Sequence, residues 1–100
     1  MSYERLKEIA IKTIEDFSDL NIFSEYGKVY NAKTKLDSIF ITAQVRSRMP
    51  PQINKLFYAE YKDNWKGIRP IEILKCESIG EFIKLVAKTS KEIVPDGEPK

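Results

Sequence analysis

The chain has 100 residues and a formal net charge of +2; 42% of its residues are apolar and 32% are charged. This length allows one domain, and the composition is that of a globular protein, neither disordered nor fibrous. Because the sequence holds no histidine and one cysteine, it excludes a histidine-dependent catalytic triad or dyad, a histidine-ligated zinc site, an iron–sulfur site and an internal disulfide bond.

Two further absences narrow the function classes. No pair among the four glycines has the spacing of a dinucleotide-binding or phosphate-binding loop. The longest strongly apolar run, Ile39-Phe40-Ile41, is far shorter than the roughly 18–20 residues of a membrane span, and the first residues have no signal-peptide core. We therefore expect a cytoplasmic protein without a membrane span, and an enzyme is the less favoured class.

The first predicted element is an amphipathic helix over residues 3–19. Its apolar residues recur at steps of three or four, which places them on one helix face: Leu6, Ile9, Ala10, Ile14, Phe17 and Leu20. Residues 21–36 then show neither helical nor strand periodicity and predict a long loop. We expect Ile22, Phe23, Val29 and Tyr30 to hold this loop against the core.

A second helix is predicted over residues 38–49, directly before the Pro50-Pro51 pair. Asp37 is a favoured N-cap, and its carboxylate suits the positive end of the helix dipole. This arrangement places Ser38 in the exposed first turn of the helix. A structural serine is the commoner meaning of such a position, and the local sequence alone does not distinguish it from a functional one.

The remaining elements are also helical. Pro51 suits the first position of a helix over residues 51–65, Gly67 ends that helix, and Pro70 begins a short helical turn that reaches Leu74. Ser78 and Glu81 match a capping box, in which the serine accepts from the third helical amide and the glutamate reaches back to the serine amide. A last helix should begin there.

Together these elements predict an all-α fold: a small bundle of four helices plus an inserted helix over residues 51–65. Residues 1–94 form the single domain, and residues 95–100 read as a flexible tail. Cys76 follows an apolar helical turn, so we expect a buried, small hydrophobic side chain, not a reactive thiol.

Five pieces of the pattern occur in the order found in acyl carrier proteins and the related peptidyl carrier domains, a family that the chain resembles. They are an amphipathic first helix at 3–20, a long loop at 21–36, the motif Asp37-Ser38-Ile39, a short helix at 71–76, and the turn Ser78-Ile79-Gly80-Glu81-Phe82. The resemblance implies that Ser38 is the attachment point of 4′-phosphopantetheine, flanked by Asp37 and Ile39. The chain would then be a non-catalytic carrier of an acyl or aminoacyl thioester, with no metal site of its own.

The resemblance also implies partners. A separate phosphopantetheinyl transferase would attach the group from coenzyme A, and loading and downstream enzymes would dock on the second helix. Carrier proteins usually present acidic residues there, whereas this chain has Arg46 and Arg48. We therefore expect partner enzymes with acidic docking surfaces and a specialised biosynthetic pathway.

An alternative of another class remains open, a small helical interaction module that binds nucleic acid or protein and whose Ser38 is never modified. Residues 38–69 carry six basic and two acidic side chains, and four of the basic ones alternate with aromatic residues. They are Lys55, Lys62, Lys66 and Arg69, among Phe57, Tyr58, Tyr61 and Trp65. Such a segment can stack on single-stranded nucleic acid. A net charge of +2 is small for that role, so nucleic acid is the less favoured partner.

Overall fold

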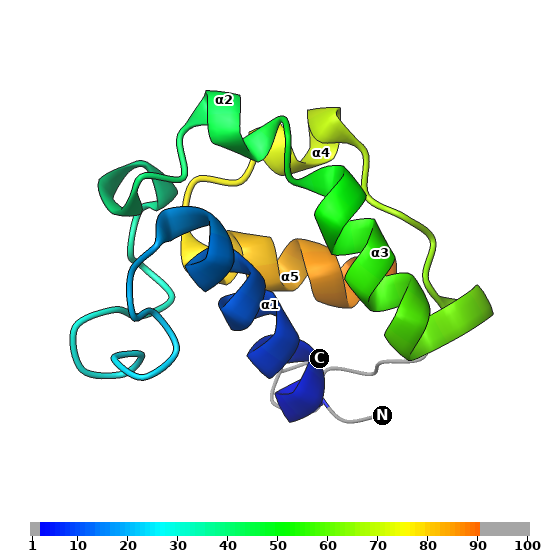
Figure 1. The fold of residues 1–100 in the computed structure, drawn as a ribbon, viewed down its shortest axis with the longest axis horizontal. Helices are drawn as coiled ribbons and strands as arrows, with labels where there is room; N and C mark the ends of the chain where they lie inside the picture. Colours follow the sequence, from blue (N-terminus) through cyan, green and yellow to red (C-terminus); the bar gives the residue numbers. More distant parts are fainter. Residues whose placement is uncertain (1–2, 91–100) are drawn as a thin grey trace.

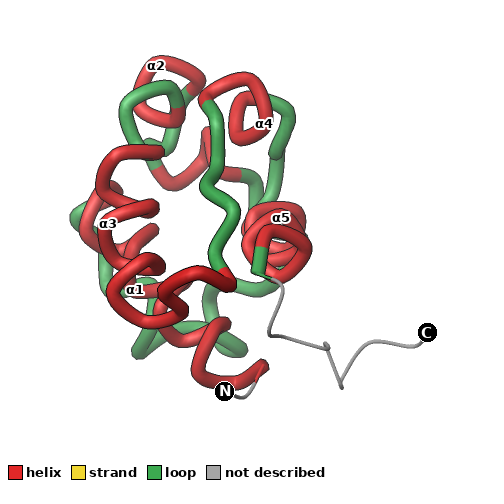
Figure 2. The backbone as a smooth tube through the Cα atoms, turned by 90° about the vertical axis from the view of Figure 1, so that its right-hand side faces the viewer, coloured by secondary structure: helices red, strands yellow, loops and turns green. Residues whose placement is uncertain are grey.

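The computed structural model describes residues 3–90, and within them every regular element is helical (Figure 2). The α-helices are α1 (Tyr3–Ser18), α2 (Ala43–Arg46), α3 (Pro50–Tyr61), α4 (Pro70–Leu74) and α5 (Ile79–Thr89). Two short 3-10 helices complete the set, η1 (Leu36–Ile39) and η2 (Lys62–Asn64). The all-α prediction is confirmed. The expected tail, 95–100, lies outside the described residues, as does the end of the expected domain after residue 90.

Helices α1 and α5 form the centre of the fold. Figure 1 shows α1 crossing in front of α5, with α3 on one side and the short helices α2 and α4 side by side above them. Half of the apolar stripe predicted for the first helix is fully buried: Leu6, Ala10 and Ile14 have no exposed surface. The other members, Ile9, Phe17 and Leu20, are partly buried against the core, and Ile11, which was not predicted, is buried. Phe82 and Val86 of α5 are likewise fully buried. The helical periodicity of the sequence therefore located the two central helices and their inner faces.

The predicted helix over 38–49 is wrong in its first half. The chain instead forms η1, turns at Phe40 with a left-handed φ of 68°, and begins α2 only after Thr42, whose hydroxyl accepts from Val45 N at 3.4 Å. Ile39 and Ile41 are both buried. Side chains two residues apart point to different faces of an α-helix, so burying both favours an irregular backbone here. Phe40, between them, is left 64% exposed.

Helix α3 begins at Pro50 and ends at Tyr61, earlier than the predicted end at residue 65. Lys62, with a φ of 55°, breaks the helix before Gly67 does. Trp65 nevertheless packs on α3, because its ring stacks on Phe57 with a centroid distance of 4.5 Å. Phe57, Tyr61 and Trp65 therefore form a buried aromatic stack, although Trp65 lies outside the helix.

The loop over 21–36 is held to the core by part of the expected set. Ile22 is fully buried and Tyr30 is half-buried against the core, as expected. Phe23 and Val29 are exposed, so this part of the prediction is wrong. The ring of Phe23 lies instead under the ammonium group of Lys12, 4.9 Å from it, which gives an exposed aromatic side chain a cationic neighbour.

Candidate functional site

The loop before Ser38 is bound to the beginning of α5 by three backbone hydrogen bonds. Leu36 N donates to Glu77 O at 2.9 Å, Ile79 N donates to Thr34 O at 3.0 Å, and Gly80 N donates to Ala32 O at 2.9 Å. Two of these bonds satisfy amides in the first turn of α5, which otherwise have no partner within the helix. Segments far apart in sequence are thereby joined, and the turn that carries Ser38 has a fixed base.

Gly80 is required by this close approach. A Cβ atom at this position would lie 2.9 Å from both the carbonyl oxygen and the Cβ of Ala32. Atoms do not approach so closely without displacement of one of the two segments. The glycine in the Ser-Ile-Gly-Glu-Phe turn therefore has a packing reason in this chain, which the sequence did not reveal.

The capping box is confirmed in one half and wrong in the other. Ser78 Oγ accepts from Glu81 N at 3.2 Å, as predicted. The Glu81 carboxylate accepts from Glu77 N at 2.7 Å, and not from the amide of Ser78. With Ser78 extended, at a φ of −136° and a ψ of 166°, the amide one residue upstream comes within reach. The helix still begins where the sequence placed it.

Ser38 is exposed, as predicted, but on a different element. It lies in η1, where its Oγ donates to Lys35 O at 2.7 Å. Asp37 is exposed and lies inside η1, and the N-cap position belongs to Lys35, so Asp37 is not the helix cap that the sequence suggested. Ile39 is buried and ties the turn to the core. The motif therefore has one anchor and two exposed polar side chains.

A surface depression of about 570 Å³ opens beside Ser38. It is lined by Lys35, Asp37, Ser38, Arg46, Leu74 and Glu77. Lys35 Nζ lies 3.8 Å from a Glu77 carboxylate oxygen, and an Asp37 oxygen lies 3.3 Å from Arg46 Nη1. Neither Lys35 nor Glu77 was predicted from the sequence to belong to a site. Each lies close in sequence to a matched motif, Lys35 before Asp37-Ser38-Ile39 and Glu77 directly before Ser78, and these positions could have indicated the two residues.

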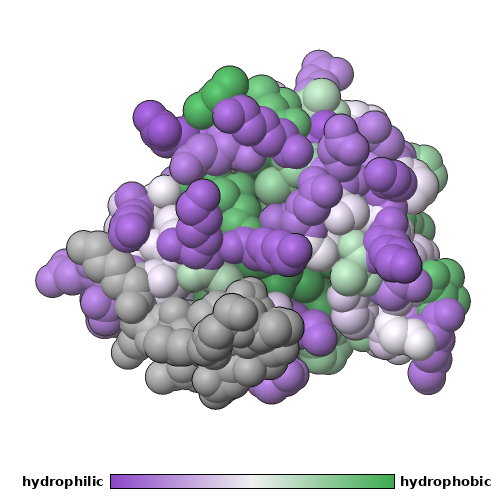
Figure 3. All heavy atoms as spheres, turned by 180° about the vertical axis from the view of Figure 1, so that it is seen from behind, coloured by the Kyte–Doolittle hydropathy of each residue, from purple (hydrophilic) through white to green (hydrophobic). Residues whose placement is uncertain are grey.

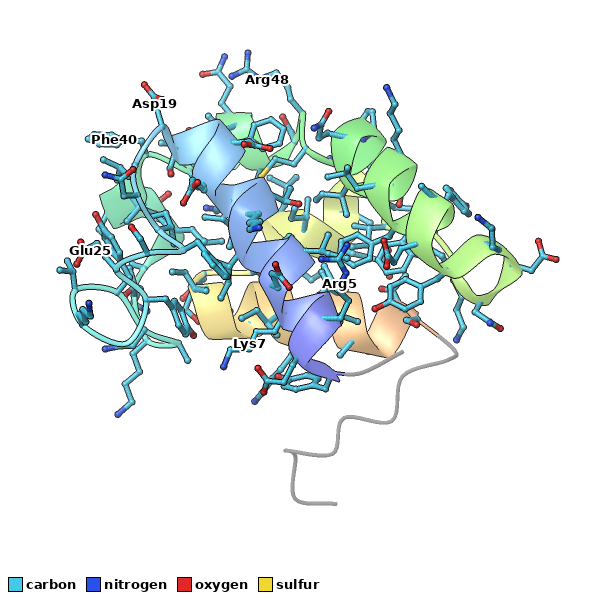
Figure 4. All side chains as sticks on the ribbon, turned by 60° about the horizontal axis from the view of Figure 1, so that its bottom comes forward. Arg5, Lys7, Asp19, Glu25, Phe40 and Arg48 are labelled. Atoms are coloured by element: carbon cyan, nitrogen blue, oxygen red, sulfur yellow. The ribbon has the colours of Figure 1, made fainter. Side chains whose placement is uncertain are left out.

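Arg46 corrects the expected docking surface, because it is only 7% exposed. Its Nη1 donates to Ile41 O at 2.8 Å and to Asp37 Oδ1 at 3.3 Å. Its Nε is buried and has no hydrogen-bond partner among the described residues. Arg48, in contrast, is exposed and projects from the surface in Figure 4. The two arginines predicted as one surface therefore have different environments, and only Arg48 can meet a partner directly.

Cys76 is buried, as predicted, and is not nucleophilic. Burial, with a smaller contribution from the nearby Glu81 charge, raises the pKa of its thiol to about 11, and Arg46 opposes this shift by a smaller amount. A protonated thiol is a poor nucleophile at neutral pH.

The aromatic residues expected near the basic middle segment do not form an exposed stacking platform. Phe57, Tyr61 and Trp65 are buried in parallel stacks, and of the four only Tyr58 is exposed. Basic side chains do gather at a second depression of about 380 Å³, lined in part by Lys66, Arg69 and Lys88. Its polar floor residue, Asn54, already bonds to backbone and indole groups.

Hydrophilic side chains cover much of the face opposite that of Figure 1, and apolar side chains reach this face near its top, in its middle and at one edge (Figure 3). Within residues 3–90, no three residues of metal-ligating type come together, and no helix is long and apolar enough to cross a membrane. The depression at Ser38 is therefore the candidate site that best combines an exposed hydroxyl with a fixed backbone.

No protein-family model matches the chain, and the comparisons with curated proteins and with solved structures also give no match.

Proposed function

We propose that this chain is a non-catalytic carrier protein, modified on Ser38 with 4′-phosphopantetheine and serving a specialised biosynthetic pathway in the cytoplasm. The observation that carries the proposal is the presentation of Ser38. Its hydroxyl is exposed on a 3-10 turn whose flanks are held by buried Ile39 on one side and by the hydrogen bonds of residues 32–36 to α5 on the other. A fixed, exposed serine is what a modifying enzyme needs.

The local chemistry suits modification by another enzyme. Ser38 Oγ donates one hydrogen bond, to Lys35 O, and its oxygen keeps its lone pairs for a new bond. In the transfer, the oxygen of Ser38 would form the bond to phosphorus, and the bond to the nucleotide half of coenzyme A would break. The general base and the metal ion belong to the transferase, so the lack of a histidine in this chain is no obstacle.

The depression beside Ser38 is the part of the chain that would hold the base of the attached group. Its lining includes two cationic side chains, Lys35 and Arg46, besides Ser38 and the carboxylates of Asp37 and Glu77, and a phosphodiester is an anion. Once loaded, the group would carry an acyl or aminoacyl cargo as a thioester. The loading and downstream enzymes would approach Ser38, and the exposed Arg48 would offer a positive charge to an acidic docking surface.

The decisive experiment is intact mass spectrometry after incubation with coenzyme A, magnesium and a promiscuous phosphopantetheinyl transferase. We expect the wild-type chain to gain the mass of one phosphopantetheine and Ser38→Ala to gain none. Ser47→Ala is a matched control, because Ser47 is also exposed and its Oγ also donates to a carbonyl three residues earlier, at 2.7 Å. This variant should be modified like the wild type.

Two results would overturn the proposal. One is the absence of any mass gain with several different transferases, and the other is an equal gain in the Ser38→Ala variant. The first result would favour the interaction module, in which Ser38 stays unmodified and the exposed residues serve a binding partner. The second would place the attachment on a residue other than Ser38.

A further inference from the structure

Arg46 is a buried cation with unused hydrogen-bonding capacity. It is one of the side chains that line the depression at Ser38, although nine-tenths of its surface is covered. One nitrogen, Nη1, is fixed by Ile41 O. The neighbouring Nε is buried without a partner among the described residues. A buried polar donor without a partner is unfavourable, and such groups in folded proteins call for an explanation.

The acidic neighbours of this depression do not supply that partner. The Asp37 side chain is 74% exposed and touches only Nη1, at the long distance of 3.3 Å. Glu77 is 72% exposed and lies nearest to Lys35, at 3.8 Å. Lys35 and Glu77 are both exposed, so their ion pair contributes little and Glu77 can move away at small energetic cost. Arg46 is buried, so Asp37 can leave it at small cost only where another anion takes its place. The two cations are then available to an anion.

We propose that Arg46, assisted by Lys35, binds the phosphate group attached to Ser38. This inference rests on the proposed function, which supplies the phosphodiester at Ser38 Oγ. A guanidinium group binds phosphate oxygens with directed hydrogen bonds, and its charge strengthens them. The Nη1 bond to Ile41 O anchors one side of the guanidinium. Nε is buried in the unloaded chain, so it gains the acceptor it lacks when the guanidinium turns this edge towards the phosphate in the depression. Arg46 is thus a positioning residue that fixes the base of the flexible arm.

The consequence for the protein is an ordered attachment point. The phosphate would be held against the depression, and freedom of motion would begin beyond it, in the pantetheine portion that carries the thioester. Arg46 then serves the prosthetic group and Arg48 serves the partner enzymes.

The test follows the Nε–Hε resonance of Arg46 by nuclear magnetic resonance in the wild-type chain before and after loading, with loading verified by intact mass. We expect the resonance to shift and its proton exchange with water to slow by at least about tenfold, which corresponds to about 1.4 kcal/mol, near the lower limit for a hydrogen bond to a charged group. A loaded protein in which the resonance and its exchange rate are unchanged would overturn the inference while leaving the proposed function intact.

A second measurement uses stability. Loading should raise the folding equilibrium constant of the wild type and of Arg48→Met by about tenfold, but not that of Arg46→Met. Equal stabilisation of all three would contradict the inference. If no transferase loads Ser38, the proposed function fails, and titration of the unmodified chain with inorganic phosphate tests the anion site alone. A saturable shift of the Arg46 resonance would then support the site, and no shift would reject it.

Discussion

Removal of the Asn54 side chain should cause a large loss in the free energy of unfolding. It lies on α3 and makes three hydrogen bonds with the segment that follows this helix. Its Oδ1 accepts from Trp65 Nε1 at 2.9 Å and from Ile68 N at 2.8 Å, and its Nδ2 donates to Ile68 O at 3.1 Å. These bonds place Trp65 on the aromatic stack and turn the chain towards α4. Asn54→Ala removes all three.

The expected loss can be estimated from these contacts. A hydrogen bond within a protein contributes about 0.5–1.5 kcal/mol net, and a donor left buried without a partner costs about 1–3 kcal/mol. Three lost bonds, with Trp65 Nε1 and Ile68 N deprived of their acceptor, predict a decrease of about 3 kcal/mol in the free energy of unfolding. For a domain of this size, that lowers the melting temperature by at least about 12 °C.

Urea denaturation followed by circular dichroism measures this loss. The matched control is Gln52→Ala, which removes an exposed amide side chain from the same helix and should change stability by less than about 0.5 kcal/mol. Trp65→Phe removes the indole donor but keeps an aromatic ring on Phe57. It should therefore cost about 1 kcal/mol less in the Asn54→Ala background than in the wild type. A similar stability of Asn54→Ala and Gln52→Ala would refute the reasoning.

Three other predictions concern the site and its surroundings. Gly80→Ala should lower the free energy of unfolding, measured in urea melts, by about 1 kcal/mol. The clash with Ala32 costs about 1–3 kcal/mol and outweighs the gain in helix propensity of up to about 1 kcal/mol. A variant more stable than the wild type would contradict the close approach. Cys76 has a pKa of about 11 against an ordinary 9.0, so at pH 8 its thiolate fraction should be about 100-fold lower than in the unfolded chain, and alkylation should be correspondingly slow in native buffer. Because the pKa of the thiol is higher in the folded chain than in the unfolded one, the thiol stabilises the fold fully below pH 9, and this stabilisation is lost as the pH rises towards 11. The free energy of unfolding of Cys76→Ala should lack this decrease between pH 9 and 11. The same pH dependence in Cys76→Ala and the wild type would show that burial does not control the thiol. Arg48→Glu should slow loading by the cognate enzyme and flatten its dependence on ionic strength, because exposed charges steer association over about 8–10 Å; an unchanged rate at two salt concentrations would remove Arg48 from the docking surface.

The sequence alone determined the fold class and the two central helices. Their apolar residues recur at helical spacing, and that pattern requires no knowledge of what packs against it. It also determined where α5 begins, because Ser78 caps the helix through contacts within four residues. The exposure of Ser38 and the burial of Cys76 followed from their local surroundings. Each of these features depends on short-range interactions.

The tertiary structure decided the features that depend on distant segments. Ile39 and Ile41 are both drawn into the core, which breaks the predicted helix over 38–49 into η1 and α2. Arg46 became a buried cation, whereas Arg48, two residues later, stayed at the surface. The charge pattern could not separate these two arginines, because the burial of a side chain depends on which elements pack over it. That information lies in the packing of the whole chain and not in the neighbouring residues.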